Sequence, residues 1–282
     1  MSVTTSPLSI SPMTGVLGAE ITGLDLSREL DDGTIAAIRQ ALCQHHVLVF
    51  RNQDLPPERQ LAFGRRFGEL DTHPFVHGNA EHPEILDVVT EPDDRINFGG
   101  GWHTDVTFLP EPDMGSILYA VDVPPSGGDT LFANQHAAYD ALSDTMKSML
   151  DGLVAVHTAS HQYGEGGTST LSKAMKTRNP ELSTTRVEHP VIRTHPESGR
   201  RGLYVNRAFT TGIKGLTSEE SRAMLTFLFR HGVKEAFTCR LVWEPGTLAI
   251  WDNRSVQHYA LHDYAGHRRV MRRITVKGDR PV

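Results

Sequence analysis

The chain has 282 residues, with a hydrophobic share of 38% and a charged share of 22%, as expected for a globular protein with a sizeable core. Its net charge of −6, from 28 basic and 34 acidic residues, argues against general nucleic-acid binding. The longest apolar runs, such as 47–50, are too short to span a bilayer, and the N-terminus lacks a signal-peptide pattern. Two cysteines give no disulfide framework, so we expect a cytoplasmic protein that binds neither nucleic acid nor membrane.

Apolar runs bounded by turn residues predict many short strands along the chain. A β-hairpin over 11–26 is followed by strands at 47–50, 85–89, 116–121, 131–133, 187–193, 202–205, 239–243, 248–252 and 270–276. Apolar residues at helical spacing predict helices at 34–42, 56–67, 135–152 and 218–231, the last capped by Ser218. Many strands with a few flanking helices indicate a mostly β fold with flanking helices, namely a double-stranded β-helix, also called a jelly roll or cupin-like fold.

No linker or repeat divides the chain, so we expect one domain over residues 1–282. The composition shifts between 158 and 186, where the glycine-rich run 164–170 has little to bury. Long segments of this kind are often lids over a site, so we expect a mobile lid around 158–186. A plain surface insertion is the alternative interpretation.

The stretch Trp102-His103-Thr104-Asp105 carries the first chemical signal. In an extended segment, side chains two residues apart point to the same side, so His103 and Asp105 can meet one metal ion. The glycines at 99–101 allow a tight turn before it, and the apolar run 106–109 would hold it on a rigid element. His258 is the best third ligand, because two histidines and one carboxylate form the facial triad of non-haem Fe(II) oxygenases.

A second signal is the group of arginines in the final predicted strand. The period of two in a strand places Arg269 and Arg273 on one face and Arg268 and Arg272 on the other. All four could lie on a solvated strand face. Alternatively, two arginines facing a metal site would be costly to bury unless anions paired with them.

Three motifs together resemble the taurine dioxygenase (TauD/TfdA) family. They are Trp-His-Thr-Asp-Val-Thr-Phe at 102–108, Gly-Gly-Asp-Thr-Leu at 127–131 and Trp-Asp-Asn-Arg…Gln-His-Tyr at 251–259. The resemblance extends over nearly the whole chain. It implies a dioxygenase, an oxidoreductase that uses Fe(II), 2-oxoglutarate and O₂.

The resemblance also implies roles for individual residues. His103, Asp105 and His258 would ligate the iron as the catalytic centre. Arg269 would pair with the distal carboxylate of 2-oxoglutarate, to which Thr130 would donate a hydrogen bond.

The predicted substrate-binding residues are His73 and Arg273 for the anionic group, Phe209 as a pocket wall, and Val106 beside the metal motif. At two further positions the chain departs from taurine-specific members, with Gly99 and Val76 in place of Asn and Tyr. Both changes remove polar contacts and add room. We therefore expect a larger, more apolar anion than taurine.

The substrate class that this implies is a sulfonate, a sulfate ester or an aryloxyalkanoate. Hydroxylation next to the heteroatom would give succinate, CO₂ and a cleaved carbonyl product. Three alternatives remain: the same chemistry on another small carboxylate, a metal-binding cupin with hydrolase or isomerase activity, and a catalytically silent binding protein. We also expect a homo-oligomer, either a dimer or a tetramer.

Overall fold

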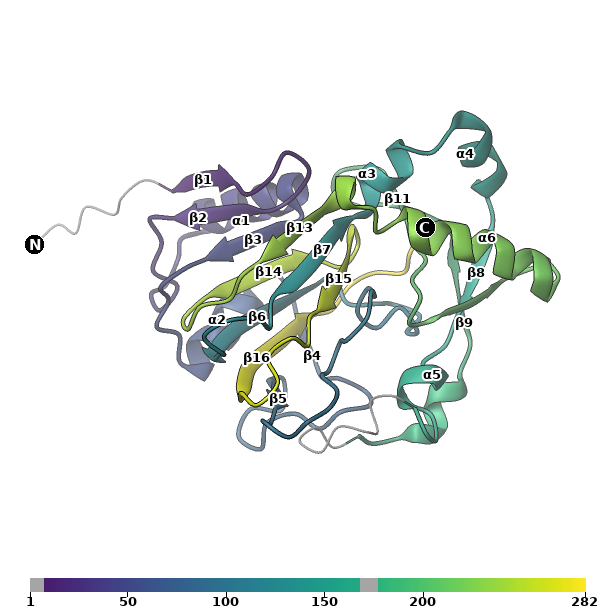
Figure 1. Cartoon of the computed structure of the whole chain (residues 1–282). Coiled ribbons are helices and arrows are strands. Elements are labelled where there is room, and N and C mark those ends of the chain that lie inside the picture. The colour runs from purple at the N-terminus through teal and green to yellow at the C-terminus, as the bar shows by residue number, and fades with distance from the viewer. Residues whose placement is uncertain (1–7, 168–176) are drawn as a thin grey trace, which may run out of the picture.

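The structure is a computed structural model that describes residues 8–167 and 177–282. Its largest sheet has eight strands (Figure 1). Their order is β1(Ser9–Pro12), β2(Ala19–Thr22), β3(Val47–Phe50), β14(Leu248–Asp252), β6(Gly115–Asp122), β16(Arg269–Val276) and β4(Leu70–Asp71), with β5(Leu86–Thr90) also paired to β16. Only β2 and β3 pair in parallel within this sheet; its other pairings are antiparallel.

A smaller antiparallel sheet lies against the large one and completes the jelly roll. Its order is β13(Thr238–Leu241), β7(Thr130–Asn134) and β15(Val256–Ala260). In its register, His258 lies opposite Phe132. The predicted fold class is confirmed.

Side-chain alternation explains how the large sheet has a core on both faces. Along β3, Val47 and Val49 belong to the core between the two sheets, which also contains Phe132 and Trp251. Leu48 and Phe50 of the same strand point the other way, into a second core with the two N-terminal helices. Because both faces are buried, β3 reads as a continuous apolar run.

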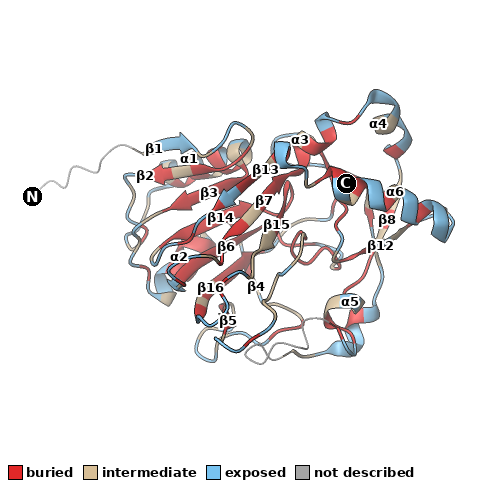
Figure 2. Ribbon diagram, in the orientation of Figure 1, coloured by how far each residue is buried: buried red, intermediate tan, exposed pale blue. Residues whose placement is uncertain are grey.

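The helices occupy two places around the sheets. α1(Asp32–His45) and α2(Pro57–Arg65) pack on the outer face of the large sheet. On the other side lie α3(Gln135–Asp140), α4(Asp144–Leu150) and α6(Ser218–His231), together with β8(Val154–His157), β9(Val187–Pro190), β10(Ile192–Thr194), β11(Arg201–Leu203) and β12(Thr210–Ile213). The sheet strands are mostly buried, whereas α6 exposes its outer side (Figure 2). Among the helices of the described residues, none combines the length and apolarity needed to cross a membrane.

Three details of the predicted elements are wrong. The helix expected over 135–152 is two helices, because Ser143 caps a new one by accepting a hydrogen bond from the Met146 N–H. The strand expected over 187–193 is divided at Val191, where the chain changes partner: its N–H bonds to the Leu153 carbonyl beside β8, and its carbonyl accepts from the Tyr204 N–H beside β11. The cap of α6 is Thr217, which forms a capping box with Glu220.

The extended segment expected for the metal motif ends at Thr104, and the apolar run after it is a series of turns. Residues 105–108 form turns, and Val106 has a φ of 45°. Such a backbone angle is a strained exception for a β-branched residue and is found mainly at functional sites.

The predicted lid spans the gap in the described chain, so residues 168–176 of it lie outside the described residues. Before the gap lies the short helix α5(Ser160–Tyr163), and after it lies the 3-10 helix η2(Pro180–Thr184). The movement of this segment and the single-domain organisation both stay predictions.

Candidate active site

The three predicted metal ligands meet at the edge of the small sheet. His103 and His258 form an isolated antiparallel bridge in which each backbone N–H bonds to the other's carbonyl, at 3.0 and 2.7 Å. Oδ1 of Asp105 lies 3.5 Å from Nε2 of His103 and 3.8 Å from Nε2 of His258. The three side chains are buried, and one ligand atom from each lies within 4.8 Å of the others.

A hydrogen bond of the His103 ring shows which of its nitrogens is left to face Asp105. Nδ1 lies 2.7 Å from the carbonyl oxygen of Gly101, which can only accept, so Nδ1 carries the proton. Nε2 is therefore the nitrogen left to face the carboxylate oxygen, and it is the atom that would ligate a metal. A metal ligand binds through a free lone pair, and a metal cation between Nε2 and the carboxylate would satisfy both.

Asp105 is held as an anion by its neighbours. Its Oδ1 accepts a hydrogen bond from Nη1 of Arg273 at 3.1 Å, and its Oδ2 accepts one from the Ser116 hydroxyl at 2.7 Å. Burial alone would raise the pKa of Asp105, but the charge of Arg273 holds it well below its ordinary value. Burial also lowers the pKa of His258 to about 3, so this ring is a neutral ligand at pH 7.

Beside the triad, a small pocket contains a buried arginine without a counterion. Nε and Nη2 of Arg269 are buried and have no hydrogen-bond partner in the described residues. Thr130 lines the same pocket, and its Oγ1 accepts from the Trp243 indole N–H at 3.0 Å, which leaves its own proton to donate. Burial lowers the pKa of Arg269, because the guanidinium has lost water without gaining an anion. The pocket therefore fits a carboxylate.

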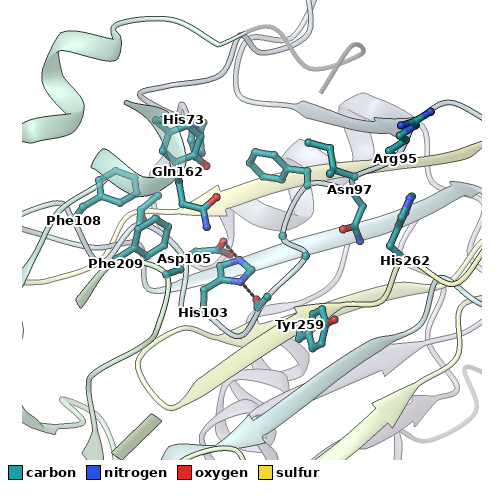
Figure 3. Close-up of a pocket in the computed structure, with 18 residues that line it drawn as sticks. His73, Arg95, Asn97, His103, Asp105, Phe108, Gln162, Phe209, Tyr259 and His262 are labelled. Carbon is teal, nitrogen blue, oxygen red and sulfur yellow. Dashed lines mark hydrogen bonds and ion pairs between the residues drawn. The ribbon is translucent and has the colours of Figure 1, made fainter. Parts of the chain in front are cut away.

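A larger cavity of about 350 Å³ opens above the triad (Figure 3). Its aromatic side is formed by His73, Phe98, Phe108, Tyr163 and Phe209. Its polar side is formed by Arg95, Asn97, Tyr259 and His262. His103 and Asp105 lie between these two groups in Figure 3, so a molecule in the cavity would lie against the metal ligands.

Comparison with known proteins agrees with this geometry. The model of the taurine catabolism dioxygenase TauD, TfdA family matches residues 9–275. The chain belongs to this family. It is a 2-oxoglutarate-dependent dioxygenase.

Two curated relatives of this TauD/TfdA chain act on sulfate esters according to their names. An alpha-ketoglutarate-dependent sulfate ester dioxygenase of Pseudomonas putida is 39% identical, with 98% of this chain and 91% of the relative covered. An alkylsulfatase of Acinetobacter baylyi is 36% identical, with 98% and 86% covered. Among solved structures, a taurine dioxygenase from Burkholderia xenovorans superposes with a TM-score of 0.82 at 36% identity, covering 98% of this chain and 91% of the other.

The structure places the predicted substrate residues in different surroundings. His73, Gly99, Val106 and Phe209 line the large cavity. Arg273 lines the small pocket instead, with its guanidinium over the Phe98 ring at 5.5 Å. Val76 lines neither pocket; it is packed in the hydrophobic core, and its backbone bridges Thr177.

The backbone of Gly99 and the hydrogen bonds of His73 bear on their predicted roles. Gly99 has a φ of +82°, and a Cβ there would lie 3.3 Å from Cε1 of His103, so this turn favours glycine. His73 accepts from the Phe75 N–H at Nδ1, so its Nε2 carries the proton. Burial and the charge of Arg273 lower the pKa of His73 to about 3, so the ring is neutral, and its Nε2–H lies 3.3 Å from the Tyr163 hydroxyl.

The residues that orient Asp105 could not be recognised from the sequence motifs. A chain of hydrogen bonds runs from the Trp251 indole to Asn253 at 2.9 Å, from Asn253 to Ser116 at 3.3 Å, and from Ser116 to Asp105. Asn253 stands inside a motif already noted in the sequence, but Ser116 appeared only as a strand residue. No sequence signal joins these two positions, because they meet through the pairing of β14 with β6.

Proposed function

We propose that this dioxygenase uses Fe(II) and O₂ with 2-oxoglutarate to hydroxylate a small organic anion next to its heteroatom. A sulfate ester is the first candidate substrate, followed by a sulfonate or an aryloxyalkanoate. The observation that carries the proposal is the buried cluster of His103, Asp105 and His258, beside an arginine with two buried nitrogens that have no partner in the described residues.

The chain's own residues would hold the reactants in place. His103, Asp105 and His258 would bind Fe(II) on one face and leave positions open for co-substrate and O₂. Bound iron with 2-oxoglutarate supplies the oxidation of a C–H bond, with succinate and CO₂ as co-products. Arg269 would pair with the remote carboxylate of 2-oxoglutarate, and Thr130 would donate a hydrogen bond to it.

Two features of the cavity favour an apolar anion over taurine. The aromatic side chains Phe98, Phe108, Tyr163 and Phe209 offer apolar contacts to an alkyl or aryl body. His73 is a neutral donor at the same side, and Arg273 lies behind Phe98. The two sulfate-ester relatives add support for this substrate class.

The proposal is tested with a panel of anions at equal concentration. Alkyl sulfates, alkyl sulfonates, aryloxyalkanoates, taurine and neutral alcohols are incubated with enzyme, Fe(II) and 2-oxoglutarate, and succinate formation and O₂ uptake are measured. We expect an alkyl sulfate to give a higher kcat/KM than taurine. If taurine is the best substrate, or a neutral molecule exceeds every anion, the proposed substrate class is wrong.

Arg273 is the predicted contact for the reacting anion and is tested separately. Arg273→Ala should raise the KM for the best sulfate ester and leave the Kd for 2-oxoglutarate nearly unchanged. Because Arg273 also bonds to Asp105, iron content is measured in the same variant. Loss of iron together with loss of turnover would assign Arg273 to the metal site instead.

A further inference from the structure

The polar side of the large cavity has a feature that the proposed reaction does not use. Arg95 lies on the loop between β5 and β6 and is exposed at the cavity wall. It is the one arginine or lysine among the described residues that line this cavity. Within the described chain, Arg95 forms no hydrogen bond or ion pair, and the adjacent Asp94 carboxylate instead accepts from the Glu91 N–H.

Neither of the two buried arginines of the site lines the large cavity. Arg269 lines the small pocket that fits the co-substrate carboxylate. Arg273 is bonded to Asp105 and covered by Phe98. Arg95 is therefore the cation that a molecule filling the large cavity meets on its polar side.

A second, independent feature lies at the same place. His262 lines the cavity beside Arg95 (Figure 3), and its Nε2 lies 3.3 Å from the Asp94 carbonyl oxygen, to which it donates. Its Nδ1 is buried and has no hydrogen-bond partner among the described residues. Asn97 is fixed beside it by a bond from its amide to the Ala260 carbonyl at 2.8 Å. This wall therefore holds a fixed amide and an imidazole beside a cation that has no partner in the described chain.

We propose that Arg95 forms a distal anion subsite at this wall, so that the preferred substrate carries a second anionic group, such as a carboxylate, remote from the oxidised carbon. The guanidinium matches a carboxylate in geometry and charge. His262 and Asn97 would form the wall beside it. This inference rests on the proposed function, because it concerns the substrate of the same site.

General electrostatic steering is the competing explanation of an exposed arginine at a cavity wall. Steering raises the association rate of every anion and weakens with salt. A subsite discriminates between molecules that differ only at their distal end. The two explanations therefore give different results for a matched pair of substrates.

The experiment uses alkyl sulfates of equal chain length that end in a carboxylate, a methyl or an ammonium group, over several lengths. KM and kcat are measured for each, and Kd is measured by calorimetry without O₂, with enzyme, Fe(II) and 2-oxoglutarate present. In the unaltered enzyme we expect the carboxylate-ended compound to bind about five-fold more tightly than the methyl-ended one. We expect kcat to be nearly equal for the two.

The variants locate the effect. Arg95→Gln should remove the preference for the carboxylate end, and Arg95→Glu should reverse it in favour of the ammonium end. Arg207→Gln is the matched control, since Arg207 is exposed and adjacent to the lining residue Ala208 but does not line the cavity. It should leave the preference unchanged.

The outcomes separate this inference from the proposed function. Equal loss for all three compounds in Arg95→Gln, or no preference in the unaltered enzyme, overturns the distal subsite while sulfate-ester oxidation stands. If none of these sulfates is turned over but Kd still shows the Arg95-dependent preference, the subsite is supported and the proposed function fails.

Discussion

Two groups of three potential metal ligands occur in the described residues, and their hydrogen bonds differ. His103, Asp105 and His258 form one group and are all buried; Cys43, His195 and Asp252 form the other, in which Cys43 is partly exposed. In both, one ligand atom from each residue lies within 4.8 Å of the others. Proximity of ligand atoms therefore does not distinguish the two groups, whereas their hydrogen bonds do.

In the second group, the acceptors are already satisfied by the protein. Arg254 donates to both carboxylate oxygens of Asp252, at 2.8 and 2.7 Å. Nε2 of His195 lies 3.0 Å from Asp252, while its Nδ1 accepts from two backbone N–H groups, those of Glu197 and Ser198. A guanidinium therefore stands where a metal would stand, and Asp252 needs no further cation.

In the first group, the ligand atoms that face one another are not held by the protein in this way. His103 donates from Nδ1 to the Gly101 carbonyl, which leaves Nε2 facing Asp105 at 3.5 Å. Arg273 donates to Asp105 through one nitrogen only, at 3.1 Å, and does not separate the carboxylate from His103. A neutral His103 would meet Asp105 lone pair to lone pair, and a metal cation would satisfy both groups.

The strongest test of this comparison is metal binding by ligand variants. Asp105→Ala and His258→Ala should abolish turnover and iron binding, because two remaining ligands cannot hold the triad geometry. Cys43→Ala should keep the iron content and activity of the unaltered enzyme. Iron per chain is measured after Fe(II) loading under argon, and succinate is measured in parallel. Full 2-oxoglutarate turnover by Asp105→Ala would refute the triad, and loss of iron in Cys43→Ala would refute the contrast.

The second prediction concerns stability at the satisfied group. Arg254→Met leaves the fully buried Asp252 carboxylate without its main counterion. Breaking such a buried pair should lower the free energy of unfolding by about 3–5 kcal/mol, measured by urea denaturation. Arg39→Met is the matched control, since Arg39 forms a more exposed pair with Glu197 at 3.3 Å. Its cost should stay below about 1 kcal/mol. Equal costs for the two variants would contradict the assigned role of Arg254.

The third prediction concerns Arg269, where substitution should weaken co-substrate binding and not the stability of the fold. Because Arg269 has no counterion, Arg269→Met should leave the stability of the protein without 2-oxoglutarate unchanged or slightly increased. The same variant should lose about 2–5 kcal/mol of 2-oxoglutarate binding, seen as a higher KM and Kd.

Arg272→Met is the control for that prediction, because Arg272 lies on the opposite face of β16 with its guanidinium over the Tyr119 ring. Its KM for 2-oxoglutarate should not change. An unchanged KM in Arg269→Met would assign the co-substrate carboxylate to another arginine.

The features that the sequence could predict are those formed by residues close together in the chain. The period of two along β16 correctly separates the buried Arg269 and Arg273 from the more exposed Arg268 and Arg272. The division of the helix at Ser143 was missed because apolar spacing continues across the break, although a serine cap is a readable signal.

The features that could not be predicted depend on contacts between distant segments. Ser116 and Asp105 are joined by the sheet, and the side chain of Arg254 reaches Glu197 from another element. The turn at Val106 opposes the backbone preference of a β-branched residue, so a local pattern favours the wrong conformation. Val76 was assigned to the substrate by position in the resemblance, whereas the structure packs it in the core.

The last prediction concerns the histidines near the satisfied group. His46 is buried at the end of α1, with Nδ1 3.1 Å from the Ser255 hydroxyl and its ring 5.3 Å from that of His136. Burial, together with the nearby His136, Arg200 and His195, lowers the pKa of His46 to about 3, although Asp252 opposes them. His46 is therefore neutral in the folded state at pH values where it is protonated in the unfolded chain.

The sign of the pH effect follows from that difference. A histidine with a lowered pKa in the folded state contributes its full stability above its ordinary value of 6.5, and the contribution is lost as pH falls toward about 3. Each such group adds a slope of about 1.4 kcal/mol per pH unit within that window. His46→Asn should reduce the overall slope by the contribution of this one histidine. Asparagine tolerates the backbone φ of 67° at this position. Urea unfolding between pH 6 and pH 4 measures the slope, and the same slope in the variant and the unaltered protein would rule His46 out as its source.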